Sequence, residues 1–124
     1  MSIFERIDGV LKLLDVPFYD RMPTFAENEE PSLYIVYTLY DRPAMRGDGV
    51  LEAIEYTVTV NVIGVDTGEV DEVQSKTLSL FEEYDFSYIG TDYRSDSEFP
   101  QRIRRIMDFM TIIESEADNY DENE

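Results

Sequence analysis

The stretch AIEYTVTVNVIG, residues 53–64, decides the fold class of this 124-residue chain. Polar and apolar side chains alternate along it, and the apolar ones are Ile54, Tyr56, Val58, Val60 and Val62. Because successive side chains of a strand point to opposite faces of a sheet, the pattern predicts a strand with one buried face. The stretch LYIVYTLY, residues 33–40, is rich in aromatic and β-branched residues and predicts a second, central strand. Residues 41–52 contain one proline and two glycines and predict the hairpin loop between the two strands.

Two amphipathic helices are predicted, one before this hairpin in the sequence and one after it. Ser2 and Glu5 have the spacing of a capping box, and apolar residues then recur at three- and four-residue steps through residue 14. The pattern predicts a helix over residues 3–14, which Gly9 weakens by about 1 kcal/mol relative to alanine. Asp66 or Thr67 offers a cap for a second helix, which the same periodicity predicts over residues 69–84.

The remaining segments carry weaker patterns. Three prolines and an acidic cluster in residues 15–32 predict a long connection, and its aromatic residues indicate that it lies across the core. Residues 87–94 predict a short strand. In residues 99–113 a helical stripe fits slightly better than a strand, whose alternation needs a bulge near Arg104 and Arg105. Residues 114–124 hold six acidic residues and no basic ones, which predicts a disordered tail.

Composition excludes several classes of function. The chain has 28 acidic and 10 basic residues, and its net charge of −18 repels nucleic-acid phosphates, so sequence-specific nucleic-acid binding is not expected. Cysteine and histidine are both absent, so thiolate and imidazole groups are excluded both as nucleophiles and as metal ligands. No phosphate-binding loop motif occurs, and no apolar run approaches the roughly 20 residues that span a bilayer. We therefore expect no enzymatic activity, no cofactor, no metal ion and no membrane insertion.

Six residues are candidate contacts to other subunits or partners: Arg42, Met45, Arg46, Arg102, Arg104 and Arg105. The first three lie in the predicted hairpin loop, where basic and apolar side chains beside exposed backbone suit contact with a partner. The last three place three positive charges within four residues. In so acidic a chain we expect them to pair with carboxylates of the same or a neighbouring subunit, and a phosphate site is the less favoured alternative.

The order of the predicted elements resembles that of the small tail terminator, or tail-to-head joining, proteins of long-tailed bacteriophages. Pro31 with the following YIVY of residues 34–37, and YTVTVNV of residues 56–62, carry the first part of the resemblance. The helix predicted over residues 69–84 and a closing strand near residues 105–113 complete it. The resemblance covers residues 1–113 and rests on the order of elements and on apolar patterns.

This resemblance implies an α+β fold: a small, mostly antiparallel four-stranded sheet with two helices packed on one face, in the order α-β-β-α-β-β. It implies one domain over residues 1–113 and favours a strand over a helix in residues 99–113. Proteins of this family form rings, typically hexamers, that cap the tail tube and meet the head connector without catalysis. The implied partners are therefore other copies of the chain, the tail tube protein and the head connector protein. The implied location is the virion, assembled in the cytoplasm of a bacterial host.

Two hypotheses from other classes compete with this one. An acidic inhibitor that mimics DNA and occupies a basic groove on a host protein would account for the net charge of −18. It would not account for the order of the elements. A small enzyme or ligand-binding domain would need a well-formed pocket with convergent polar groups, which no motif in the sequence indicates.

Overall fold

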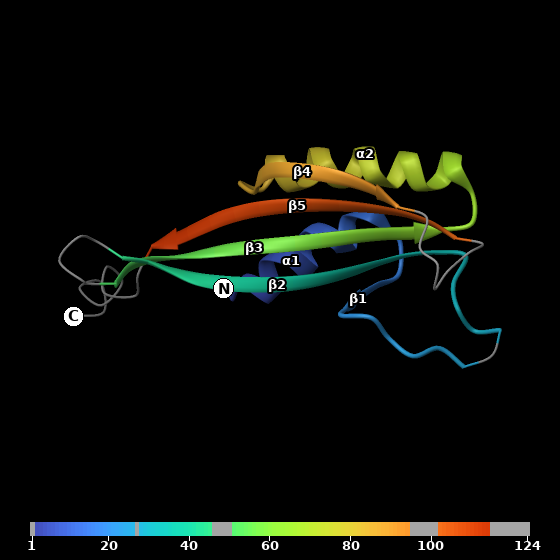
Figure 1. Ribbon diagram of the computed structural model, residues 1–124, viewed down its shortest axis with the longest axis horizontal. Helices are drawn as coiled ribbons and strands as arrows, with labels where there is room; N and C mark the ends of the chain where they lie inside the picture. The colour runs from blue at the N-terminus through green and yellow to red at the C-terminus, as the bar shows by residue number, and fades with distance from the viewer. Residues whose placement is uncertain (1, 27, 46–50, 95–101, 115–124) are drawn as a thin grey trace.

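The computed structural model describes residues 2–26, 28–45, 51–94 and 102–114. Its helices and strands, in chain order, are α1 (Ile3–Leu11), the 3₁₀ helix η1 (Lys12–Leu14), β1 (Phe18–Asp20), β2 (Leu33–Met45), β3 (Leu51–Gly64), α2 (Thr67–Glu83), β4 (Ser87–Arg94) and β5 (Ile103–Glu114). The strands form one sheet in the order β1-β2-β3-β5-β4. Figure 1 shows β2, β3 and β5 as long strands whose hairpin end extends beyond both helices.

The sheet has five strands, so the predicted count of four is wrong. The additional strand, β1, lies in the segment predicted as a connection and pairs in parallel with β2. It is held at both ends, because the Ile35 amide donates to the Pro17 carbonyl oxygen and the Arg21 amide donates to the Tyr37 carbonyl oxygen, each at 2.9 Å. The other neighbouring strands are antiparallel, as predicted. A strand of three residues is too short for an alternating pattern to predict it.

The strands of the β2–β3 hairpin are longer than predicted. Residues 41–52 were expected to form a loop, but β2 continues to Met45 and β3 begins at Leu51, while residues 46–50 lie outside the described residues. Pro43 is tolerated within β2 because β1 pairs only as far as Tyr37. Beyond that point the described part of the chain places no strand on this side of β2, so the missing amide of proline breaks no ladder bond.

Residues 103–114 form a strand, which confirms the strand expected for this segment. The bulge predicted near Arg104 and Arg105 is wrong, because the register between β3 and β5 is continuous from Gly64↔Ile103 to Ala53↔Glu114. Arg105 interrupts the apolar alternation for another reason: its Nε lies 3.3 Å from an Asp71 carboxylate oxygen on α2. The irregular pairing in this part of the sheet lies instead in β4, between Tyr88 and Gly90.

The N-terminal caps of both helices follow the sequence. The Ser2 hydroxyl accepts from the Glu5 amide at 3.1 Å while the Ser2 amide donates to the Glu5 carboxylate at 3.2 Å, which confirms the capping box. The last predicted turn of the first helix is η1, and Asp15 ends it in the left-handed conformation. Asp66 caps α2 by accepting from the Glu69 amide at 2.9 Å. This helix therefore begins at Thr67, two residues earlier than predicted.

Both helices pack on the same face of the sheet, as predicted. Their buried residues form one cluster with residues of β2, β3 and β5 and with Phe86, which directly precedes β4. The members are Ile3, Ile7, Val10, Leu11, Ile35, Tyr37, Val58, Val60, Val62, Val70, Val73, Phe81, Phe86, Met107 and Phe109. The close approach of α2 to the end of β3 depends on Gly64. A Cβ atom there would lie 2.7 Å from Cγ2 of Val70, closer than side chains pack.

The opposite face of the sheet is covered at one end by the connection that follows β1. Tyr34, Val36 and Ile63 are buried there, with Tyr19 and Phe25 packed against them. The three aromatic rings of this cluster meet edge to face at centroid distances of 5.2 to 6.1 Å. The connection was expected to lie across the core. It does so through Phe25, which packs on the face of the sheet that carries no helix.

Because two tyrosines are buried, we expect the chain to lose stability in alkaline solution. The hydroxyl of Tyr37 donates to Asp8 at 3.0 Å and that of Tyr34 donates to Glu30 at 2.6 Å. Burial, and then the hydrogen bond to a carboxylate, raise the pKa of both phenols above the ordinary value of 10.0. The folded chain therefore keeps protons that the unfolded chain releases, so this stability is complete below pH 10 and decreases as the pH rises further.

We expect the free energy of unfolding to fall above about pH 10, by at most about 1.4 kcal/mol per pH unit for each tyrosine. Urea unfolding at a series of pH values measures the slope. A variant with Tyr34→Phe and Tyr37→Phe should be less stable at neutral pH but should show a flatter alkaline limb. An unchanged slope in that variant would contradict the assignment to these two phenols.

Candidate interaction surfaces

Arg102, which directly precedes β5, links this strand to the connection between β1 and β2 through contacts with Glu30 and Pro31. Its Nη1 donates to the Pro31 carbonyl oxygen at 2.6 Å, and its Nε lies 3.5 Å from a Glu30 carboxylate oxygen. The same carboxylate accepts the Tyr34 hydroxyl, and the Arg102 guanidinium lies 5.9 Å from the centroid of the Tyr34 ring. The Arg102 side chain is only 15% exposed. This network holds the covering segment against the helix-free face of the sheet.

The other two arginines of this group are also engaged within the chain. The Arg104 Nε donates to the Asn61 side-chain oxygen at 2.9 Å, and Arg105 pairs with Asp71. Pairing with carboxylates of the same chain is therefore confirmed for Arg102 and Arg105. Contact of any of the three with another subunit stays a prediction. The alternative of a phosphate site gains nothing from guanidinium groups that are already bound to groups of this chain.

The second predicted group lies at the hairpin end of β2. The Arg42 side chain is 74% exposed and forms an ion pair at 3.2 Å with Glu55, the residue opposite it on β3. Exposed pairs of this kind contribute about 0.2 to 1 kcal/mol, so Arg42 is available to a partner at little cost. The Met45 backbone pairs with Leu51. Arg46 lies outside the described residues.

The other end of the helix-free face is covered by none of the described residues and presents a mixed polar and apolar surface. β2 contributes Tyr40, 68% exposed, and β5 contributes Ile112, 54% exposed. Thr59 of β3 and Asp108 of β5 lie opposite each other on the same face and are joined by a hydrogen bond of 2.6 Å. Threonines and a carboxylate make most of this surface compatible with water, so it does not by itself define a binding site.

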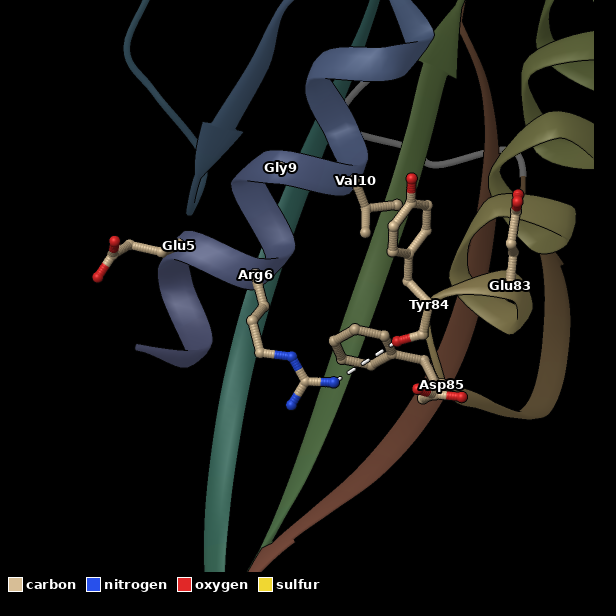
Figure 2. Close-up of a pocket in the computed structure, with 8 residues that line it drawn as sticks. Glu5, Arg6, Gly9, Val10, Glu83, Tyr84 and Asp85 are labelled. Carbon is tan, nitrogen blue, oxygen red and sulfur yellow. Dashed lines mark hydrogen bonds between the residues drawn. The ribbon is translucent and has the colours of Figure 1, made fainter. Parts of the chain in front are cut away.

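A pocket of about 400 Å³ lies between α1 and the C-terminal end of α2. Its lining residues are Glu5, Arg6, Gly9, Val10, Glu83, Tyr84, Asp85 and Phe86. Figure 2 shows Arg6 reaching from α1 toward the end of α2, where its Nη2 donates to the Tyr84 carbonyl oxygen at 3.5 Å. Its guanidinium also lies 5.2 Å from the centroid of the Phe86 ring. The Glu5 side chain points away from this contact because it takes part in the capping box.

The end of α2 that forms one wall of this pocket has a hydrogen-bonded C-terminal cap. The Phe86 amide donates to the Phe81 carbonyl oxygen at 2.9 Å and the Asp85 amide to the Glu82 carbonyl oxygen at 3.3 Å, the two bonds of a Schellman motif. Asp85 occupies the left-handed position of the motif, with φ of 69°. The Phe81 and Phe86 rings make the accompanying apolar contact at 5.0 Å. The positions of Tyr84 and Asp85 in the pocket wall are thus fixed by the helix end.

The sequence did not indicate this pocket. Its two walls are more than 70 residues apart in the chain, and no motif links them. The one available signal was Gly9, which stands in a helix and weakens it. Among the described residues no cluster of three metal-ligating side chains occurs, and none of the helices found there is long and apolar enough to cross a membrane.

Gly9 has no structural role within the chain that alanine could not fill. It lies in α1 with an ordinary helical conformation, and a Cβ atom placed on it would meet no atom within 4 Å. We expect Gly9→Ala to raise the free energy of unfolding by about 0.5 to 1 kcal/mol, because alanine is the better helix former. Urea unfolding measures the change. Gly64→Ala is the matched control and should destabilise the chain, since its Cβ would meet Val70.

Comparison with protein-family models gives no match for this sequence, and neither does comparison with curated proteins. Comparison of the fold with solved structures does give matches. One is a chain of a structure described as "Virion of native gene transfer agent (GTA) particle", with a TM-score of 0.60, 11% sequence identity and 92% of each chain covered. At this identity the likeness establishes a shared fold. The chain therefore has the fold of a component of a virion.

Proposed function

We propose that this chain is a structural protein of a bacteriophage or phage-like particle, of the tail terminator type. The supporting observation is the fold shared with a virion chain over 92% of both lengths. The arrangement of two helices on one face of a mostly antiparallel sheet also agrees with the resemblance drawn from the sequence. In this role the protein belongs to the virion, is assembled in the bacterial cytoplasm and acts by shape and charge without catalysis.

The proposed assembly is a closed ring, with six copies as the expected number, that caps the tail tube and meets the head connector. A ring needs head-to-tail contacts, in which two different surfaces of each copy meet. The hairpin end that extends beyond the helices offers one such surface, with the exposed Arg42 on it. Arg42 is an exposed basic side chain in a chain of net charge −18, so it favours contact with an acidic surface of a neighbouring copy.

Solution mass tests the self-association that this function requires. Copies with a net charge of −18 repel one another, and salt screens that repulsion, so we expect the oligomer to form more readily at high salt than at low salt. Light scattering over a range of protein and salt concentrations measures the mass, and negative-stain electron microscopy shows whether the particles are rings.

A monomer under all of these conditions would contradict a ring that the chain forms by itself. It would favour the acidic DNA mimic, whose own test is different. A mimic should be displaced from a basic host protein by duplex DNA in a competition assay, whereas a tail terminator should not compete with DNA.

A further inference from the structure

We propose that the pocket between α1 and the C-terminal end of α2 is a docking site for a lysine or arginine side chain of a partner protein. The proposal rests on the chemistry of this chain alone and holds whether or not the chain works in a virion. The pocket has a volume of about 400 Å³, within the range of roughly 300 to 1,000 Å³ that is typical of ligand-binding pockets.

The first argument is the room that Gly9 leaves. Glycine in a helix is less stable than alanine, and here neither a positive φ nor a close neighbour requires it. Gly9 lines the pocket, and a Cβ atom placed on it would meet no atom within 4 Å. The chain thus forgoes helix stability at an α1 position that lines the pocket. A reason for this choice is the close approach of an occupant to the α1 backbone.

The second argument is the charge at the end of α2. The carbonyl end of a helix carries a partial negative charge and is usually stabilised by basic residues, but the last turn of α2 has none. Glu82, Glu83 and Asp85 add three carboxylates at this end. Among the residues that line the pocket, Arg6 is basic and Glu5, Glu83 and Asp85 are acidic, so one positive charge against three negative charges leaves a net charge of −2. The pocket therefore attracts a cation and repels an anion.

The third argument is the nature of the walls. The lining is more apolar than polar, and its residues include Gly9, Val10, Tyr84 and Phe86, of which Tyr84 is 46% exposed. A cationic group beside a tyrosine ring is attracted by the electrons of its face. Arg6 already shows this chemistry, since its guanidinium binds a carbonyl oxygen of the helix end and lies over the Phe86 ring. Apolar walls with a negative mouth suit a long aliphatic stem that ends in a positive charge.

These properties favour one occupant over the others. A free metal ion is disfavoured because the described residues contain no cluster of three side chains that could hold one. A second copy of the chain brings a net charge of −18 with it, so it is favoured less than a basic segment, and the titration below distinguishes the two. A basic segment of a different protein is drawn by the same field. The partner is therefore a protein that presents an arginine or lysine flanked by apolar residues.

Nuclear magnetic resonance titration of the full ¹⁵N-labelled chain tests the proposal. The probe is the peptide acetyl-Leu-Arg-Leu-amide in salt at about 0.15 M, where the Debye length of about 8 Å suppresses diffuse attraction. We expect saturable shifts confined to the amides of Gly9, Val10 and residues 83–86. The peptide with citrulline in place of arginine has the same shape without the charge, and it should bind at least about tenfold more weakly.

Two variants with one matched control locate the binding. Gly9→Leu should abolish the shifts by filling the pocket. A Cβ atom at this position would meet no atom within 4 Å, so we expect the variant to stay folded. Glu83→Gln combined with Asp85→Asn should weaken binding about tenfold. Glu69→Gln combined with Glu72→Gln removes the same charge from the other end of α2 and should leave the affinity unchanged.

Three results would overturn the proposal. The first is the absence of saturable shifts with the arginine peptide. The second is equal weakening by the two double variants, which would indicate attraction to the whole acidic surface. The third is a set of shifts at the same amides that depends on protein concentration without peptide, which would assign the pocket to a second copy of the chain.

Discussion

Replacing Phe81 with alanine is expected to lower the free energy of unfolding by about 3 to 5 kcal/mol. The side chain is fully buried where α2 crosses the sheet. Its ring stacks on Phe109 of β5 at 4.6 Å and meets Phe86 edge to face at 5.0 Å. Alanine would remove both aromatic contacts and leave a cavity beside Phe86 and Phe109 that the surrounding side chains cannot fill completely. For a chain of this size the loss approaches a large fraction of the total stability.

Urea unfolding followed by circular dichroism measures this effect, and Phe4→Ala provides the control. Phe4 lies in the other helix and is 43% exposed, so its removal should cost less than about 1 kcal/mol. If Phe81→Ala and Phe4→Ala had similar effects, α2 would not be packed on the sheet as described. That result would also remove the fixed wall of the pocket, because the same aromatic contact closes the end of α2.

The parts of the fold that the sequence predicted are those in which burial follows a regular period. The alternation of β3 and the helical repeats of α1 and α2 each arise because one face of the element packs on the core. β1 could not be predicted in this way, because three residues between prolines show no period. Its position depends on hydrogen bonds to β2 residues some 17 positions later, which local pattern does not reveal.

The interaction surfaces were harder to predict than the fold, because they depend on which segments meet in space. The sequence indicated that Arg102 and Arg105 pair with carboxylates, yet it could not identify Glu30 and Asp71 as the partners. The pocket arises because α1 lies beside a helix end that follows it by more than 70 residues. Gly9 was visible only as a residue that weakens a helix, and the open space beside it appears only in the folded chain.

Arg102→Ala is expected to destabilise the chain by about 2 to 3 kcal/mol, whereas Arg42→Ala should change its stability by less than about 1 kcal/mol. Both arginines were predicted as partner contacts, but the Arg102 side chain is 15% exposed and that of Arg42 is 74% exposed. Loss of Arg102 leaves the Glu30 carboxylate without its cation and the Pro31 carbonyl without its donor. Urea unfolding of the two variants gives the comparison directly.

A double-mutant cycle separates the role of Arg102 within the chain from any role toward a partner. If Glu30→Gln restores part of the stability lost in Arg102→Ala, the loss comes from an unpaired carboxylate inside this chain. Arg102 then fastens the segment that covers the helix-free face, and Arg42 is the arginine of this pair that can meet another subunit without loss of stability. If Arg102→Ala leaves the stability unchanged, the guanidinium is free to leave Glu30, and Arg102 regains the role of a partner contact that the sequence predicted.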